Sequence, residues 1–193
     1  MPEIRSVAVF CGSRPGDSPV YLQAAAALGE GLARSGIALV FGGGRVGLMG
    51  AVADATLKAG GRVIGVIPDF LTRREVAHPA ISELIVTETM HARKRRMFEL
   101  SDAFISLPGG LGTFDETIEI ITWRQLGLHA KPVLICDVAG SAEPLLAMID
   151  SAIAHGFAAA SARGLYERVD CVPALLARLG KLAAPTGGEA ALL

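Results

Sequence analysis

The segment from Leu107 to Glu116, LPGGLGTFDE, has the residue types of an anion-binding loop followed by a chemically active side chain. We predict that a strand ends at its Pro-Gly-Gly and that a helix begins near Thr113. The N–H groups and the dipole of a helix N-terminus attract an anion such as phosphate. Glu116 follows one turn later, and because a carboxylate does not help to bind an anion, its position indicates chemistry. Thr113 and Glu116 also fit a capping box, which is the purely structural alternative.

Two more glycine-containing loops follow predicted strands. After the first strand, Gly12 permits a sharp turn and Ser13 could donate to an anion, although a plain turn explains both residues equally well. The run Gly42–Gly47, GGGRVG, satisfies the dinucleotide pattern GxGxxG, with Asp69 about twenty residues further on. It follows the second strand, whereas that fingerprint normally follows the first. The small residues still let an anion approach the backbone. Cys11, beside Gly12, is interpreted as a small buried residue and not as a nucleophile.

The segment Met90–Met97, MHARKRRM, places positive charge at the start of a predicted helix. Met90, Arg93 and Met97 share one helical stripe, so we expect Arg93 to point between apolar neighbours toward a pocket. The run from Lys94 to Arg96, taken alone, is typical of a solvated basic face. No Walker sequence occurs in the chain, which disfavours P-loop ATP chemistry.

The composition narrows the classes of protein. The chain has 193 residues, of which 51% are hydrophobic and 5% aromatic, and its mean hydropathy is +0.47. No apolar run approaches the ~20 residues that span a bilayer. The high content of hydrophobic residues therefore predicts a doubly covered sheet or a subunit interface. A net charge of -1 disfavours nucleic-acid binding. The opening residues, MPEIRSVAVF, lead into a strand and do not resemble a signal peptide. We expect no membrane or nucleic-acid partner and a cytoplasmic location.

The cysteines and histidines show no metal-ligand spacing. Cys11, Cys136 and Cys171 are widely separated and form no CxxC pair, so they indicate reduced thiols and not a disulfide framework. The four histidines are equally scattered. We therefore predict no protein metal site.

The elements that must position these loops alternate between strands and helices. Short apolar runs predict strands at Ser6–Cys11, Ala38–Phe41, Arg62–Ile67, Glu83–Thr87, Ala103–Leu107 and Pro132–Cys136. Longer periodic stretches predict helices at Ser18–Ser35, Leu48–Ala59, Met90–Leu100, Thr113–Leu126 and Ala142–His155, with a last helix after Pro173. This alternation predicts an α/β fold: a Rossmann-like, doubly wound parallel sheet in three α/β/α layers. We expect one nucleotide-binding domain over residues 1–182 and a disordered tail over 183–193.

Several of these motifs, in this order, resemble the LONELY GUY family, which was long mislabelled as lysine decarboxylases. The resemblance extends over nearly the whole chain except the tail, and it includes Ile121-Thr122-Trp123 and Gln125-Leu126-Gly127. Its most specific part is the pattern Pro108-Gly109-Gly110-x-Gly112-Thr113-x-x-Glu116. The other matching segments are Cys11-Gly12-Ser13, Gly42-Gly43-Gly44 leading to Gly47-Leu48-Met49-Gly50, and Met90-His91-x-Arg93-Lys94. The sequence departs from the family at Arg14, where small polar residues are frequent, and at Asp115, where Glu is usual.

The resemblance implies a Rossmann-like homodimer, without a cofactor, that hydrolyses cytokinin riboside 5′-monophosphates or AMP. The products would be the free base and ribose 5-phosphate. The residues that match the catalytic pair of the family are Arg93 and Glu116. In that family the glycine loop that matches Gly109 to Thr113 holds the phosphate, and Thr122 matches a threonine that contacts the ligand. We predict that the residues binding the substrate and its phosphate are Gly12, Ser13, Gly43, Gly44, Met90, Lys94, Gly109, Gly110, Gly112, Thr113 and Thr122.

The same residues are compatible with two other functions. The glycine loops could serve a non-catalytic nucleotide carrier or sensor, in which case no product would form. The pattern of Gly42–Gly47 with Asp69 could serve an NAD-dependent oxidoreductase, which we rank third because of the position of the loop.

Overall fold

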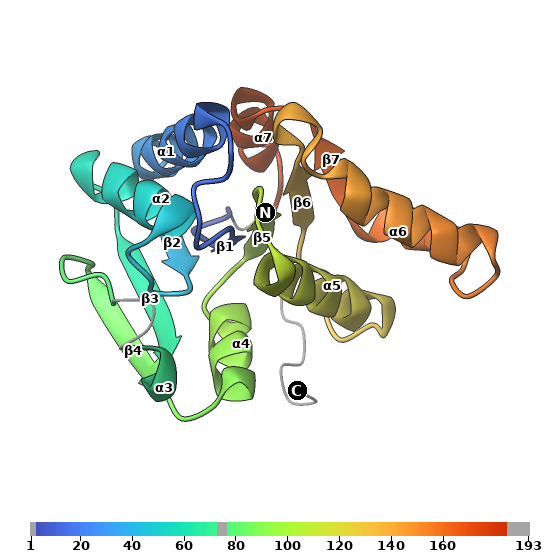
Figure 1. Cartoon of the computed structure of the whole chain (residues 1–193), viewed down its shortest axis with the longest axis horizontal. Coiled ribbons are helices and arrows are strands. Elements are labelled where there is room, and N and C mark those ends of the chain that lie inside the picture. The colour runs from blue at the N-terminus through green and yellow to red at the C-terminus, as the bar shows by residue number, and fades with distance from the viewer. Residues whose placement is uncertain (1–2, 73–76, 185–193) are drawn as a thin grey trace.

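The computed structural model describes residues 3–72 and 77–184, and within them all strands form one parallel sheet (Figure 1). Its strand order is β4-β3-β2-β1-β5-β6-β7. The strands are β1 Ser6–Phe10, β2 Ala38–Phe41, β3 Val63–Pro68, β4 Glu83–Thr87, β5 Ala103–Ser106, β6 Val133–Cys136 and β7 Glu167–Val169. The order reverses between β1 and β5, whose register pairs Val7 with Ala103 and Phe10 with Ser106. In open α/β sheets this switch point is where ligands bind.

Helices cover both faces of the sheet (Figure 1). The helices are α1 Pro19–Arg34, α2 Gly47–Lys58, α3 Asp69–Thr72, α4 Met90–Glu99, α5 Leu111–Gln125, α6 Glu143–Ala154 and α7 Val172–Leu179, with 3-10 turns at Val138–Gly140 and Ala160–Leu165. In β1, Val7 and Val9 pack into the cluster under α1, α2 and α7, whereas Ala8 and Phe10 pack into the cluster under α4, α5 and α6. Because successive strand residues point to opposite faces, both faces are apolar, and the predicted three-layer arrangement is confirmed.

Every predicted strand is confirmed, with ends shifted by at most one residue. The predicted helices are confirmed as well, including the last one, but α3, β7 and the 3-10 turns were not predicted. The predicted start of α5 is wrong. The helix begins at Leu111 behind an extended Gly110 that has no side-chain cap, so Thr113 is its third residue. Thr113 is therefore not an N-cap, and the capping-box alternative does not apply.

The end of the chain differs from the expected tail. Ala183 forms a bridge with Glu3, and Ala184 packs into the core, so these two residues belong to the fold. Residues 185–193 lie outside the described residues. None of the helices in residues 3–72 and 77–184 has the length and apolar character that crossing a membrane requires.

Candidate active site

The three glycine-containing loops meet at the carboxyl end of the sheet, around the switch point. The Gly12 N–H donates to the Pro108 carbonyl at 3.0 Å, which joins the loop after β1 to the loop after β5. The Leu48 N–H donates to the Gly12 carbonyl at 2.9 Å, which joins the start of α2 to the same point. Parallel topology brings these strand ends to one edge, so segments far apart in the chain form one site.

The N-terminus of α5 opens into a cavity of about 170 Å³. The N–H groups of Leu111, Gly112 and Thr113 precede the first helical hydrogen bond, which Phe114 donates to the Gly110 carbonyl at 3.0 Å. They are therefore available to an anion. The residues that line the cavity are Cys11, Gly12, Ser13, Met49, Met90, Arg93, Gly110, Leu111, Gly112, Thr113, Asp115 and Glu116.

Arg93 and Glu116 face each other across this cavity from α4 and α5. Nη2 of Arg93 lies 3.6 Å from Oε1 of Glu116, and the two side chains are only 7% and 13% exposed. The Nε of Arg93 donates to the Val66 carbonyl at 3.1 Å, and Nη1 lies 3.8 Å from the sulfur of Met90. A buried guanidinium fixed in this way presents a defined positive charge to the Glu116 carboxylate.

Cys11 lines the cavity but does not have the properties of a nucleophile. Burial, and to a smaller extent the charge of Glu116, raises the pKa of the Cys11 thiol far above its ordinary value. The thiolate is the reactive form of cysteine, so this side chain is inert. The interpretation of Cys11 as a buried residue agrees with this environment.

A second cavity, of about 610 Å³, adjoins the first. Both are lined by Gly12, Ser13, Gly110 and Leu111, and the larger one extends toward Arg14, Tyr21 and Ser141. Arg14, a departure from the family pattern, is exposed and stands in this outer cavity.

Other predicted site residues lie outside the smaller cavity. Gly43 and Gly44 are buried beside it; the Gly43 carbonyl accepts a hydrogen bond from the His78 N–H at 3.0 Å, and Gly44 pairs with Ala77. Thr122 is exposed on α5, and its hydroxyl donates to the Ile118 carbonyl at 2.8 Å. Gly109 lines the larger cavity, and a side chain there would overlap Thr113.

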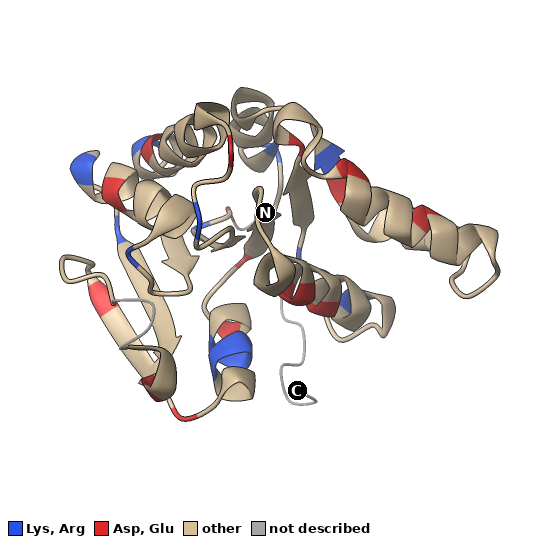
Figure 2. Cartoon of the chain, viewed as in Figure 1, with Lys and Arg blue, Asp and Glu red and all other residues tan. Residues whose placement is uncertain are grey.

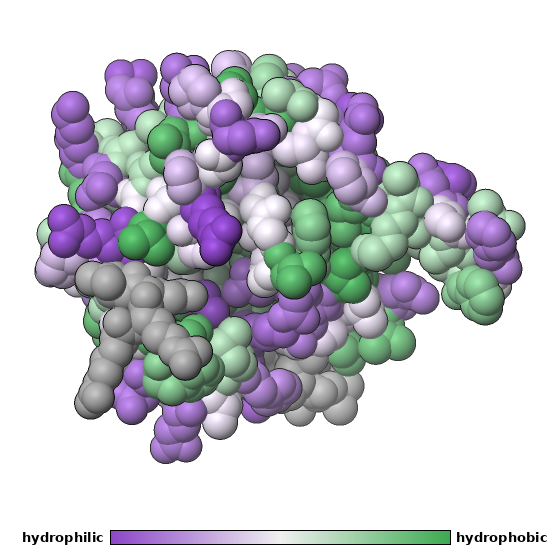
Figure 3. Space-filling model, in the orientation of Figure 1, coloured by the Kyte–Doolittle hydropathy of each residue, from purple (hydrophilic) through white to green (hydrophobic). Residues whose placement is uncertain are grey.

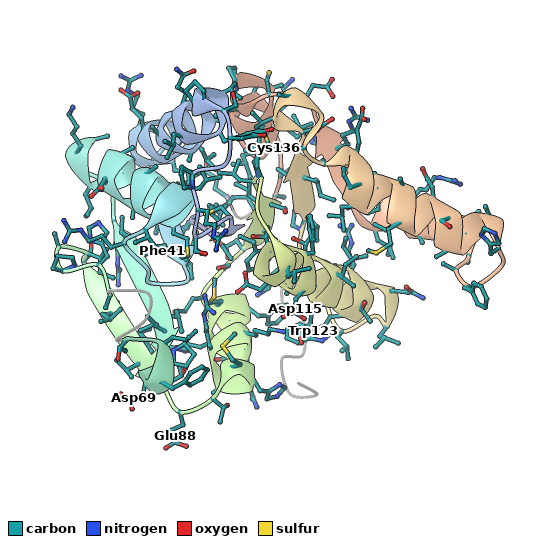
Figure 4. All side chains as sticks on the ribbon, viewed as in Figure 1. Phe41, Asp69, Glu88, Asp115, Trp123 and Cys136 are labelled. Atoms are coloured by element: carbon teal, nitrogen blue, oxygen red, sulfur yellow. The ribbon has the colours of Figure 1, made fainter. Side chains whose placement is uncertain are left out.

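Lys94 is directed to α5 and not into the cavity. Its Nζ lies 2.6 Å from Oδ2 of Asp115 and 3.3 Å from Oε2 of Glu119. Asp115 is on α5 at the side of the helix that faces α4 (Figure 4).

Sequence reasoning missed Met49, Leu111 and the Val66 carbonyl. Met49 lies two residues after the run Gly42–Gly47 and within a segment that matches the family, so its place in the chain was an available signal. A backbone carbonyl such as that of Val66 leaves no signal in a sequence.

Comparison with solved structures places the chain in a known fold. A molybdenum cofactor binding protein from Rippkaea orientalis aligns with a TM-score of 0.70 and 24% identity, covering 94% of this chain and 98% of that one. The molybdenum cofactor carrier protein of Chlamydomonas reinhardtii aligns with a TM-score of 0.68 and 22% identity, over 92% and 96% of the two chains. At these identities the likeness concerns the fold alone.

Comparison of sequences is more specific. A family model described as "Possible lysine decarboxylase" matches residues 49–179. Cytokinin riboside 5′-monophosphate phosphoribohydrolase LOG2 of Arabidopsis thaliana is 45% identical over 172 residues, which are 89% of this chain and 81% of the relative. The cytokinin riboside 5′-monophosphate phosphoribohydrolase of Rhodococcoides fascians is 49% identical over 157 residues, which are 81% and 79% of the two chains. The chain therefore belongs to the LONELY GUY family of cytokinin riboside 5′-monophosphate phosphoribohydrolases.

Proposed function

We propose that this protein hydrolyses the N-glycosidic bond of AMP or of a cytokinin riboside 5′-monophosphate, releasing the adenine-type base and ribose 5-phosphate. The observation that carries the proposal is the buried pair of Arg93 and Glu116 in the same cavity as the N-terminus of α5. One part of this cavity is suited to an anion, and the other holds an oriented carboxylate. The relatives named for this reaction are 45% and 49% identical to the chain, which supports it.

The phosphate is proposed to bind at the first turn of α5. The N–H groups of Leu111, Gly112 and Thr113 and the helix dipole would hold it, with Ser13 supplying a hydroxyl. Glu116 is one turn further along the same helix, so a nucleotide anchored by its phosphate places its ribose in front of the carboxylate. Such anchoring makes the reacting geometry reproducible, which is a large part of catalysis.

Glu116 is proposed to act at the anomeric carbon. Cleavage of the bond builds positive charge at C1′ and negative charge on the leaving base. The carboxylate would stabilise the oxocarbenium-like centre and orient or deprotonate the attacking water, by analogy with glycosidase carboxylates. A positioned base of this kind typically contributes about 10²–10⁴-fold.

Arg93 is proposed to orient Glu116 and to bind substrate oxygens. A guanidinium stays protonated in proteins, so it is a poor general acid. Its planar group instead gives directed hydrogen bonds, and the Val66 carbonyl fixes its orientation. Arg93 would thus hold the carboxylate in place.

The lysine decarboxylase description does not fit the lysine nearest to this site. Pyridoxal chemistry needs a lysine that can become neutral and form a Schiff base. Although burial lowers the pKa of Lys94, its hydrogen bonds to Asp115 and Glu119 raise that pKa overall, which keeps the amine charged. A visible pyridoxal absorbance band in the purified protein would contradict this assignment.

The protein is further proposed to be a homodimer. β4 is an edge strand whose Leu84 and Val86 are 40% and 52% exposed, and the neighbouring Phe70 of α3 is 56% exposed. Figure 3 shows hydrophobic residues at the lower left of the molecule, where α3 lies. An exposed apolar edge strand can pair with another strand, and a second copy of the chain would cover it.

Sedimentation of the purified protein should give twice the chain mass, and Val86→Lys should shift the measured mass to that of the monomer. A wild-type monomer would refute the dimer.

A cytoplasmic location is also proposed. Cys11, Cys136 and Cys171 are all free thiols. Free thiols are typical of proteins in a reducing compartment. Fractionation of the source cells with an antibody against the protein would test this, and recovery outside the cytoplasm would contradict it.

The reaction is tested by incubating the purified protein with AMP and, separately, with isopentenyladenosine 5′-monophosphate, and separating the free base by chromatography. We expect base release by the wild type and a loss of at least about 100-fold in Glu116→Gln, with nucleotide binding retained. The relative rates would identify the preferred substrate. Binding without base release by the wild type would refute the proposal and favour a nucleotide carrier.

A further inference from the structure

We propose that Lys94 is a positioning residue for this reaction and not a phosphate ligand. With Asp115 and Glu119 it forms a charged brace between α4 and α5, and the brace sets the gap across which Arg93 and Glu116 meet. This inference rests on the proposed function, because it concerns the geometry of the same catalytic pair. It reassigns a residue that was predicted from the sequence to bind the substrate.

The brace lies directly beside the catalytic pair. Lys94 follows Arg93 on α4, and Asp115 precedes Glu116 on α5. Nζ of Lys94 is 2.6 Å from Asp115 and 3.3 Å from Glu119, and its side chain is only 15% exposed. Figure 2 shows the basic segment of α4 facing the acidic segment of α5. Met90 and Arg93 line the smaller cavity, whereas Lys94 does not.

The two helices rest on different parts of the molecule, so their spacing near the site needs its own support. α4 packs mainly on β3 and β4, whereas α5 contacts β1 and the 3-10 turn at Ala160–Leu165. At their far ends they touch through Phe98 and Trp123, whose rings meet edge to face at 5.4 Å. Near the site, long charged side chains bridge them. The aromatic contact therefore fixes one end of the helix pair, and the charged side chains hold the end that carries the catalytic groups.

The charges explain what the loss of Lys94 would do. Asp115, Glu116 and Glu119 lie close together on α5, and Lys94 contacts two of these carboxylates. Without the ammonium group, Asp115 and Glu119 lose their cation, and the three carboxylates repel one another. Arg93 then becomes the nearest cation on α4 for Asp115 and Glu119 as well as for Glu116. The Arg93 guanidinium would then be drawn away from its place opposite Glu116. A displacement of about 1 Å in a catalytic site can reduce turnover by about 100-fold.

The test measures base release from AMP and compares kcat and the KM for AMP among four variants. These are Lys94→Met, Lys94→Arg, the double variant Asp115→Asn/Glu119→Gln, and the triple variant that combines this double variant with Lys94→Met. We expect Lys94→Met to lower kcat about 10- to 100-fold while KM changes by less than about 3-fold. Lys94→Arg, which keeps the positive charge, should retain most of the wild-type kcat. Adding Asp115→Asn/Glu119→Gln to Lys94→Met should cause no further loss, because the three residues act as one unit.

Arg95→Met is the matched control. Arg95 is a neighbouring cation on α4, and its Nε contacts Glu99 of the same helix at 3.0 Å. Replacing Arg95 removes one positive charge from α4 but none of the contacts of Lys94 with Asp115 and Glu119 on α5, so kcat should not change. A loss of kcat in Arg95→Met equal to that in Lys94→Met would attribute the effect to net charge and overturn the brace. Thermal denaturation of each variant reports whether folding is retained.

AMP affinity, measured by calorimetry in the Glu116→Gln background, tests the inference separately from turnover. A positioning role predicts that Lys94→Met leaves the Kd for AMP within about 3-fold, whereas loss of a phosphate ligand would weaken binding by 10-fold or more. Weaker binding with unchanged kcat would overturn the proposal. If the wild type releases no base, the proposed function fails, and the affinity measurement still decides whether Lys94 binds the nucleotide.

Discussion

Nη2 of Arg93 occupies the space that a methyl group on Gly42 would need. The glycine loop after β2 therefore makes room for a guanidinium that arrives from α4, and a dinucleotide could not approach the backbone at this point. Asp69, the other half of the dinucleotide pattern, begins α3 at an exposed position away from Phe41, the last residue of β2 (Figure 4). The geometry thus gives Gly42 a role in placing Arg93.

Gly42→Ala should displace Arg93 and lower kcat by about 10- to 100-fold, because the added methyl group overlaps the guanidinium. Steady-state kinetics of base release would measure the loss. Gly164→Ala is the control, since no atom lies within 4 Å of the position that its Cβ would take. Unchanged kcat in Gly42→Ala would show that the location of Arg93 does not limit turnover.

Thr117 should be important for the stability of α5 at the site. Its buried hydroxyl donates to the Thr113 carbonyl at 2.7 Å and lies 3.0 Å from the Ser106 hydroxyl. Thr117→Val leaves these groups without their partner and should lower the free energy of unfolding by about 1–3 kcal/mol. Denaturant unfolding would measure the change. Thr122→Val removes a similar bond at an exposed position and should cost less than about 0.5 kcal/mol. Equal losses in the two variants would contradict this account.

His129 should make the fold less stable in mild acid. Burial, with a contribution from the charges of Lys131 and Arg124, lowers the pKa of His129 from its ordinary value of 6.5. Its ring lies 2.9 Å from the Ile120 carbonyl through Nε2 and accepts the Lys131 N–H at 3.1 Å, as a neutral imidazole can. The unfolded chain binds a proton near pH 6.5 that the fold excludes. The stability contributed by the neutral ring is therefore complete above pH 6.5 and is lost as the pH falls below it.

Unfolding curves at several pH values between neutral and mildly acidic would measure this loss, at most about 1.4 kcal/mol per pH unit for one proton. His129→Gln should be less stable than the wild type but should lose less stability on acidification. His155→Gln, at an exposed histidine, should keep the wild-type slope. Identical slopes in the wild type and His129→Gln would contradict the prediction.

Thiol reagents should distinguish the cysteines. Cys11 is buried with a raised pKa, and burial raises the pKa of Cys136 to about 12. Cys171 is exposed. Iodoacetamide in slightly alkaline solution should therefore alkylate Cys171 alone in the folded protein and leave base release unchanged, as read by mass spectrometry and activity. Rapid labelling of Cys11 with loss of activity would instead identify a reactive thiol at the site.

The order of strands and helices, and the edge of the sheet at which the glycine-containing loops lie, follow from the amino-acid sequence alone. Apolar runs such as Ala38–Phe41 are long enough for a strand and too short for a helix, and the connections between them require parallel pairing. Parallel strands bring their carboxyl ends to one edge, so the loops containing Gly12 and Gly110 had to meet. Glu116 could be predicted as a site residue because it stands one helical turn after the glycine loop, and this local spacing does not depend on the rest of the fold.

The directions of the charged side chains, by contrast, depend on how the helices pack. The pattern around Lys94 is the same whether its ammonium group meets a phosphate or two carboxylates, because the choice depends on the distance between α4 and α5. The start of α5 at Leu111 depends on the backbone conformation of Gly110, which a glycine adopts under the influence of its surroundings. The role of Gly42 depends on a guanidinium that comes from a different helix. Contacts between segments distant in the chain are set by packing, and a local pattern of residue types does not specify them.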